Sequence, residues 1–564
     1  MWGHCTPRNA RKTGTLVGAL LLLAAIMAGP ALAQVGLPPS YDVQKVDPPN
    51  RQVGGGFGSG AASAGDVNGD GKDDFLAYQL AGSPGNDGEV YVISGATGER
   101  IDTIYAPDPD PDATGLTGTN NDNEANFGFP WLSKVGTNQG SSPGEFTDLA
   151  SCPGASPTTD PDKPLCGGAV GPPDGIPDIL VGARGVDAQG RTDAGRVYVF
   201  DGRTRALLKR IDMPPEDVTD LALGDGKRKG GVWFGRTAVN PAGQPGCEGN
   251  SSVGPCQPVS RAVQIGDMDA DGRPDLVVGA SATSEDPSTA HPNSECASAS
   301  ADAFCSAQGR AYIYRGEDIV GSSPAEILDG SGSNETVKRL KNLYAQSAGG
   351  SGLFANSLAP IGDVGSCTAP GIGAGDLCPA GAVSAAPDGK PDIVVGALRT
   401  DLPFDSPGGA LQDAGVSHVV DGVTGAVLRT YQSPDPQGFA VFGSQFLQPA
   451  GGDMGEDELP DAYIPAAAHN TDGAPTGGRG WVFSGNPTDP NPLISTIADP
   501  TPHEAENFGY AAVGVGDLVG GADAPRNELL VASEGPFFTA PGGFAPDPPP
   551  NDLHFFNGAT GRVL

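Results

Sequence analysis

The chain has 564 residues, and its 68 acidic and 33 basic side chains give a formal net charge of −35 at pH 7. This charge argues against nucleic acid and anionic membrane surfaces as partners, because their phosphates would be repelled. Glycine (87 residues) and proline (54 residues) make up about a quarter of the chain, a level typical of disorder unless the sequence repeats.

The N-terminus has the pattern of a secretory signal peptide. Basic residues between Arg8 and Lys12 precede the apolar run Leu16–Gly29, and Ala31–Ala33 fits the cleavage rule. We expect residues 1–33 to be removed, so that the mature chain starts at Gln34 and is secreted, or held at the cell surface or in the periplasm. A retained anchor is the alternative, but the apolar run is short for a span, and no later stretch could cross a membrane.

Eight cysteines follow the signal peptide and support export. Each falls close to one other, within an insertion rich in Gly, Pro and Ser: Cys152 and Cys166, Cys247 and Cys256, Cys296 and Cys305, and Cys367 and Cys378. We predict that each pair forms a disulfide that closes a short loop. Zinc is the alternative, but the chain has no CxxC motif and no histidine at ligand spacing.

Three strand patterns recur along the mature chain. Short apolar runs bounded by Gly, Pro and Asp predict buried strands at Phe75–Tyr78, Ile179–Ala183, Leu276–Ala280, Ile393–Ala397, Tyr463–Ala467 and Leu529–Ser533. An aromatic residue, usually in a Phe-Gly step, precedes each run, at Phe57, Phe127, Phe234, Phe354, Phe442 and Phe508. An alternating strand and a turn follow each run, at Glu89–Gly98, Arg196–Arg205, Arg310–Asp318, Val416–Gly425, Gly480–Pro487 and Leu553–Gly561. A further strand usually comes next, which gives six units of about four strands.

Four strands per unit predict an all-β fold, a β-propeller with six blades. An array of β-sandwiches is the alternative, but the inner runs end in small residues that suit a crowded central channel. We expect one domain, residues 34–564, with disulfide-bearing loop insertions in units two, three and four.

The last unit ends at Leu564, where the other units enter their outermost strand. The segment Tyr41–Val46 resembles such a strand, so we predict that it completes the last blade and closes the ring. A chain that has lost a final blade or an anchor is the alternative.

The acidic stretch DVNGDGKDD has the spacing of a loop around a hard cation. Oxygens recur at positions 1, 3, 5, 7 and 9, the seventh being a backbone carbonyl, and Gly71 at position 6 permits a sharp turn. The ligands would be Asp66, Asn68, Asp70, Lys72 and Asp74 in the first unit, and Asp267, Asp269, Asp271, Arg273 and Asp275 in the third. This mixed shell suits Ca²⁺ better than Mg²⁺, and position 12 lies in a predicted strand, which excludes an EF-hand. An acidic turn without metal is the alternative.

The other four units depart from this pattern. The fourth has Asp363, an insertion, and then Asp388 and Asp392; the fifth has Asp453, Asp457 and Asp461, but Gly455 at position 3 and Glu458 where glycine is expected. Calcium and a metal-free turn both remain open for these two. The second has Asp174 and Asp178 with Thr137 in place of the leading aspartate, and the sixth has Asp517, Asp523 and Asn527 at irregular spacing. For these two a metal-free turn is favoured.

The order FG, GDxNGDGxxD, VGA and GxVYVF resembles the FG-GAP repeats of the integrin α-chain N-terminal propeller. The resemblance covers nearly all of the mature chain and is clearest in the first and third units. It implies calcium in inter-strand loops and adhesion or ligand binding through the loops. Integrin propellers have seven blades, which remains the alternative to six. Integrin leg domains, membrane span and tail have no counterpart here, so we expect a free-standing secreted relative.

Catalytic motifs are weak in this chain. The mature histidines are scattered, and the G-x-S-x-G match at Gly140–Gly144 lies in a Gly/Pro-rich insertion without a strand-turn-helix context. We therefore expect a non-enzymatic monomer that binds an extracellular protein or glycan. An extracellular hydrolase on a propeller scaffold and a structural matrix or envelope component are the alternatives.

Overall fold

The computed structural model divides the chain into two units, Met1–Lys45 and Val46–Leu564. The residues it describes all lie in the second unit: 46–49, 57, 61–79, 88–107, 127–135, 148–153, 166, 170–183, 186, 188, 195–215, 262–281, 309–321, 326–332, 335, 337–341, 353–402, 411–443, 448–449, 452–455, 457–471, 474–504, 506–509, 511–516, 528–533 and 553–564. The predicted signal peptide lies outside these residues.

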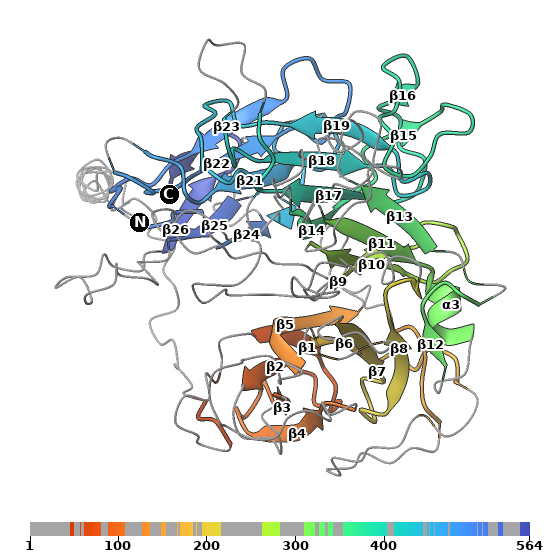
Figure 1. Cartoon of the computed structure of the whole chain (residues 1–564). Helices are drawn as coiled ribbons and strands as arrows, with labels where there is room; N and C mark the ends of the chain where they lie inside the picture. The colour runs from red at the N-terminus through yellow and green to blue at the C-terminus, as the bar shows by residue number, and fades with distance from the viewer. Residues whose placement is uncertain are drawn as a thin grey trace, which may run out of the picture. The chain divides into compact units, whose positions relative to one another are not determined.

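The described residues form six main sheets, each built on four antiparallel strands that follow one another in chain order across the sheet (Figure 1). The first contains β1 (Ala61–Gly65), β2 (Asp74–Gln79), β3 (Glu89–Ile93) and β4 (Arg100–Tyr105). The second contains β5 (Phe127–Val135), β6 (Asp178–Ala183), β7 (Arg196–Phe200) and β8 (Leu207–Ile211). The third contains β9 (Ala262–Gly266), β10 (Asp275–Ala280), β11 (Arg310–Tyr314) and β13 (Val337–Lys341).

The later sheets repeat this order. The fourth contains β14 (Phe354–Gly362), β17 (Asp392–Ala397), β18 (Val416–Val420) and β19 (Val427–Tyr431). The fifth contains β20 (Gln448–Pro449), β21 (Ala462–Ala466), β22 (Arg479–Phe483) and β23 (Leu493–Ile497). The sixth contains β24 (Ala511–Gly516), β25 (Glu528–Ala532), β26 (Leu553–Asn557) and β27 (Arg562–Val563).

Small elements decorate the repeat. A short helix, α3 (Gly316–Gly321), follows β11, and β12 (Ile327–Leu328) adds a fifth, parallel strand beside β8. In the insertion of the fourth unit, β15 (Ser366–Cys367) pairs with β16 (Val383–Ser384). Among the described residues, no helix is both long and apolar enough to cross a bilayer. The chain is thus strand-rich, as predicted, and the repeated four-stranded sheet supports a propeller-type fold.

In five of the sheets, the aromatic residue at or before the start of the first strand packs on the third strand. Phe442 is fully buried, with its ring centroid 5.8 Å from that of Trp481 and 6.0 Å from that of Phe483, both on β22. The same arrangement joins Phe57 to Tyr91, Phe127 to Tyr198, Phe354 to His418, and Phe508 to Phe556. Burying a side chain of this size stabilises the fold by about 1.5–3 kcal/mol.

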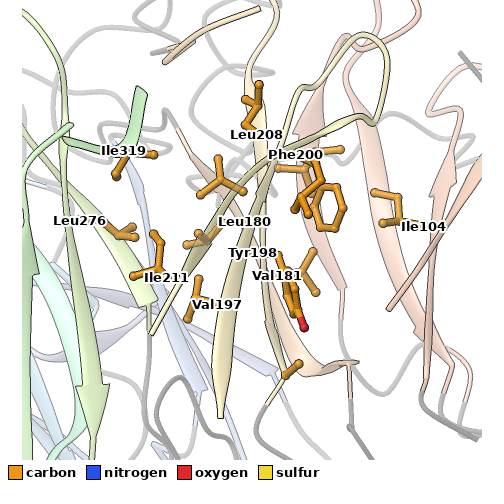
Figure 2. Close-up of a cluster of buried hydrophobic side chains, with 14 of the residues drawn as sticks. Ile104, Leu180, Val181, Val197, Tyr198, Phe200, Leu208, Ile211, Leu276 and Ile319 are labelled. Carbon is orange, nitrogen blue, oxygen red and sulfur yellow. The ribbon is translucent and has the colours of Figure 1, made fainter. Parts of the chain in front are cut away.

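Apolar side chains also join neighbouring sheets. One buried cluster draws residues from the first three sheets, and Figure 2 shows Ile104 of β4, Leu180 of β6 and Leu276 of β10 within it. Leu180 and Ile104 are each about 1 % exposed. Neighbouring sheets therefore pack against each other through buried apolar side chains, as the units of a repeat fold do.

Glycine permits a second contact between successive units. Gly478, just before β22, has φ +82°, and a Cβ added there would lie 2.2 Å from the carbonyl oxygen of Phe508 in the next unit. The backbone N–H of Phe508 donates to the carbonyl of Gly477 at 2.9 Å. Equivalent close approaches occur at Gly88 with Phe127, Gly309 with Phe354, and Gly415 with Phe442. The Phe-Gly step thus docks against the preceding unit.

Of the expected closing strand, Tyr41–Val46, the described residues include only Val46. Tyr41–Lys45 lie outside the described residues, and Val46 packs against the cluster of Ala77, Tyr91 and Ile93 in the first sheet. The outermost position of the sixth sheet begins with β27, where Val563 pairs with Phe556. Closure of the last blade by Tyr41–Val46 stays a prediction.

The contact between units can be tested with two glycine substitutions. Gly478 and Gly371 both have positive φ, but a Cβ on Gly371 would meet nothing within 4 Å. Gly371→Ala should cost only the left-handed backbone strain, about 1–2 kcal/mol. Gly478→Ala should cost more, about 3 kcal/mol or beyond, because a buried backbone must move. Calorimetric melting would measure both, and equal losses would contradict the docking role of Gly478.

Candidate metal-binding loops

The first acidic loop, Asp66–Asp74, joins β1 to β2 and is held by its own carboxylates. Asp66 accepts backbone N–H bonds from Asp70 through Oδ1 at 2.9 Å and from Gly71 through Oδ2 at 2.8 Å. Asp70 in turn accepts the N–H of Lys72 at 2.9 Å. Gly71 has φ +82°, as the predicted sharp turn requires. The oxygens at positions 1, 3 and 5 therefore lie on one tight turn.

The third unit repeats this geometry between β9 and β10. Asp267 accepts the N–H groups of Asp271 at 3.1 Å and Gly272 at 2.9 Å. Carboxylate oxygens of Asp267, Asp269 and Asp275 lie within 4.8 Å of one another, as do those of Asp269, Asp271 and Glu317. Carboxylates this close repel one another unless a cation or protons intervene. The donor set is oxygen alone, which suits a hard cation such as Ca²⁺.

Position 9 has a role that the spacing alone did not reveal. Asp275, about 1 % exposed, accepts the N–H of Met268 in the loop and that of Gly316, the first residue of α3 after β11, both at 2.8 Å. The same pair of bonds is made by the buried aspartate that begins the second strand in three other sheets, Asp74, Asp178 and Asp392, and by Asp461, which immediately precedes β21. This residue ties the acidic loop to a distant turn, besides facing the proposed ion.

The second unit requires a correction. Thr137 lies outside the described residues, and the leading aspartate is Asp148, which accepts the N–H groups of Asp174 and Gly175. In the fourth unit Asp363 does the same for Asp388, at 3.1 Å, and for Gly389. A D-x-x-S-C sequence begins at the leading aspartate in both units, at residues 148–152 and 363–367, and this match could have identified Asp148.

The fifth loop keeps the shape despite its two departures. Asp453 accepts the N–H of Asp457 at 3.2 Å and that of Glu458 at 2.8 Å, and Glu458 adopts φ +66° in place of glycine. A non-glycine residue in this region costs about 1 kcal/mol or more. The loop is therefore maintained by the carboxylates and not by glycine alone.

The sixth loop is largely outside the described residues, including Asp517, Asp523 and Asn527. The position equivalent to Asp74 at the start of the second strand is Glu528, which begins β25 and is buried. The sequence had suggested Asn527 there. The described part of this unit thus keeps an acidic residue at the strand start.

Two of the four predicted disulfides are present among the described residues. Cys152–Cys166 and Cys367–Cys378 lie in the insertions of the second and fourth units. The N–H of Cys152 donates to Asp201 at 2.7 Å, and that of Cys367 donates to Asp421 at 2.6 Å. Each insertion is therefore anchored to the turn that follows the third strand of its own sheet.

The other two predicted disulfides, both in the third unit, stay predictions. Cys247 and its predicted partner Cys256 lie outside the described residues. Cys296 and its predicted partner Cys305 lie outside them as well. The structure therefore bears out the pairing of near neighbours in the second and fourth units and leaves it untested in the third.

Burial perturbs the carboxyl groups of these loops. It raises the pKa of Asp275 and that of Asp461 to about 7, and that of Asp148 to about 6. Burial also holds the pKa of Asp178 and that of Asp392 well above the ordinary value. Backbone N–H bonds act in the opposite direction but do not cancel the desolvation of the charged form.

A comparison with protein families identifies the repeat. A family model described as "FG-GAP repeat" matches residues 57–93 and 174–200. The chain carries FG-GAP repeats. The first match runs from Phe57 through the first acidic loop to the end of β3, and the second begins at Asp174, after the insertion.

Beyond the FG-GAP repeats, the chain shows little similarity to known proteins. A search of curated proteins found no match. Among solved structures, exotype rhamnogalacturonan lyase YesX is 11 % identical with a TM-score of 0.29, covering 85 % of this chain and 65 % of that one. Rhamnogalacturonan lyase YesW is 10 % identical with a TM-score of 0.25, and Bacillus licheniformis rhamnogalacturonan lyase PL11 is 10 % identical with a TM-score of 0.27. Each of the latter two covers 85 % of this chain and 70 % of the other.

The raised pKa values predict how the metal-free protein responds to pH. A buried carboxyl whose folded-state pKa exceeds its unfolded value stabilises the fold below about pH 4, and this contribution is lost as the pH rises towards 7. We expect the urea midpoint of calcium-free protein to fall between about pH 4.5 and about pH 7.5, with added calcium reducing the fall. Asp461→Asn should flatten part of the slope, since asparagine does not titrate. A midpoint that rises across this window without calcium would contradict the prediction.

Proposed function

We propose that this chain is a secreted, calcium-binding FG-GAP propeller that binds an extracellular protein or glycan and catalyses no reaction. In this proposal six blades form the ring, Tyr41–Val46 closes it, and the protein acts as a monomer. The observation that carries the calcium proposal is the hydrogen-bond scheme that five acidic loops share, with the carboxylates of Asp267, Asp269 and Asp275 gathered within 4.8 Å. A binding role is supported by the FG-GAP repeats and by the disulfide-anchored insertions that adjoin the acidic loops.

Calcium would act here as a structural ligand. Each loop connects a first strand to a second strand, and in the third unit the carboxylates of the loop gather within 4.8 Å. A bound cation would neutralise this repulsion, so the folded state would gain the free energy of ion binding. Linkage gives about 2.7 kcal/mol for one site at a calcium concentration about 100 times its Kd.

Removal of calcium tests this proposal. Chelation should lower the melting temperature, and added calcium should restore it. In the first loop, Asp70→Asn should weaken the calcium response, whereas Asp73→Asn should preserve it, since Asp73 is exposed and lies at position 8, where no ligand is expected. A melting temperature indifferent to chelator and calcium would refute the calcium proposal.

Binding and catalysis can be separated with two panels. The mature chain, loaded with calcium, would be screened on arrays of glycans and matrix proteins and assayed as an esterase, phosphatase and glycosidase. We expect saturable binding to a defined class of array ligand and no turnover. Sustained turnover that scales with protein concentration would instead favour the hydrolase, and silence in both panels would favour a structural component of a matrix or envelope.

A further inference from the structure

The residue after a recurring turn glycine differs in charge between units. That glycine donates its N–H to the buried aspartate of the second strand, as Gly202 does to Asp178 at 3.1 Å. A Cβ on Gly202 would lie 1.8 Å from the carbonyl oxygen of Pro177, so the turn presses directly on the end of the acidic loop. The residue that follows the glycine is Ala96, Arg203, Glu317, Val423 and Asn486 in the first five units.

Two described contacts show that this position faces the acidic loop. In the third unit a carboxylate oxygen of Glu317 lies within 4.8 Å of oxygens from Asp269 and Asp271. In the second unit Nε of Arg203 lies 2.6 Å from Oδ2 of Asp174, the aspartate at position 5. Nη2 of Arg203 also lies 3.5 Å from the backbone oxygen of Asp174. The second loop therefore holds a cation supplied by the chain.

The second loop keeps the acidic residues at positions 1, 5 and 9, which are Asp148, Asp174 and Asp178, whereas position 3 is Ala150. Asp148 is 5 % exposed, and its Oδ2 accepts two backbone N–H bonds, but its Oδ1 is buried without a hydrogen-bond partner among the described residues. Asp178 is completely buried at the start of β6. An unpaired buried carboxylate oxygen is costly unless positive charge lies near it. The loop thus combines an open acceptor, two further carboxylates and the guanidinium of Arg203, while Nη1 of Arg273 donates to the carbonyl of Leu149 at 3.0 Å.

We propose that Arg203 takes the place of the metal ion in the second acidic loop, so that this loop is held without calcium while its three aspartates persist. A guanidinium forms strong charge-assisted bonds to carboxylates and cannot lose its proton, so it serves as a permanent counter-ion. The fourth loop has the same insertion and leading aspartate but carries Val423 at this position, which leaves its carboxylates to a metal. This inference rests on the proposed calcium function, and it names the unit that departs from it.

The test is a count of bound calcium ions per chain, by equilibrium dialysis of the mature protein, in wild type and three variants. Arg203→Val copies the residue of the fourth unit and should bind one ion more than wild type. Arg203→Lys keeps the positive charge and should bind no additional ion. Arg562→Val removes an exposed arginine from the sixth sheet, and it controls for the change in net charge. Because the Arg203 side chain is 53 % exposed, its substitution should leave the sheets folded.

The outcomes separate this inference from the calcium proposal. If Arg203→Val binds the same number of ions as wild type, or if Arg203→Lys or Arg562→Val gains an ion as well, the inference is overturned. A wild-type chain that binds no calcium refutes the proposed function. Even then, one ion bound by Arg203→Val alone would support the inference, and none bound would overturn it too.

Discussion

The repeat depends on the hydrogen bonds that a buried carboxylate at the start of the second strand accepts from backbone N–H groups. Asp275 accepts one N–H from the acidic loop before it and another from a turn about 40 residues later. Ionising such a group in the interior is unfavourable, and backbone N–H bonds compensate for only part of the cost. Because part of this cost remains, a positive charge beside the carboxylate would stabilise its ionised form. Loop, strand and turn are thereby fixed by one side chain, and any cation at the loop stabilises all three.

A second local device governs how units meet. The Phe-Gly step fills the face of its own sheet with an aromatic ring, as Phe442 does against Trp481, and places its backbone against a glycine of the preceding unit. Because the contact is between backbones, it depends little on side-chain identity, and the surrounding residues are free to vary. The Phe-Ala step at Phe354 shows this tolerance, since Ala355 adopts φ +62° where glycine would be relaxed. Repetition of two local devices thus gives the repeat its regularity.

Features whose residues are close together in the sequence could be predicted, whereas features built from distant residues could not. The predicted buried runs and alternating strands of the six units lie within short windows, and periodicity predicted these strands correctly. The sharp turns of the first and third loops were also predicted from spacing, whereas their calcium stays a prediction, and Phe234 of the third unit lies outside the described residues. Asp148 was missed because 25 residues separate it from Asp174, and Thr137 stood nearer to the expected distance from the preceding aromatic residue. At Glu458 the missing glycine left calcium and a metal-free turn both open, and the structure shows that Asp453 accepts the N–H of Glu458 in a turn with positive φ. The double bonding of position 9 could not be predicted, since its partner turn is identified only by tertiary structure.

The length of an acidic loop and the charge of the residue beside it vary independently between units. The insertions of the second and fourth units both start after the leading aspartate and end at an Asp-Gly step. In each unit a cysteine N–H anchors the insertion to an aspartate in the turn after the third strand. The disulfide therefore limits the freedom of the added residues, while the first and last ligands keep their positions. With the ends fixed, one residue beside the turn is enough to change the local charge, as Arg203 and Val423 illustrate. In a chain with 68 acidic residues, a guanidinium supplied by the chain would also make one loop independent of the proposed calcium.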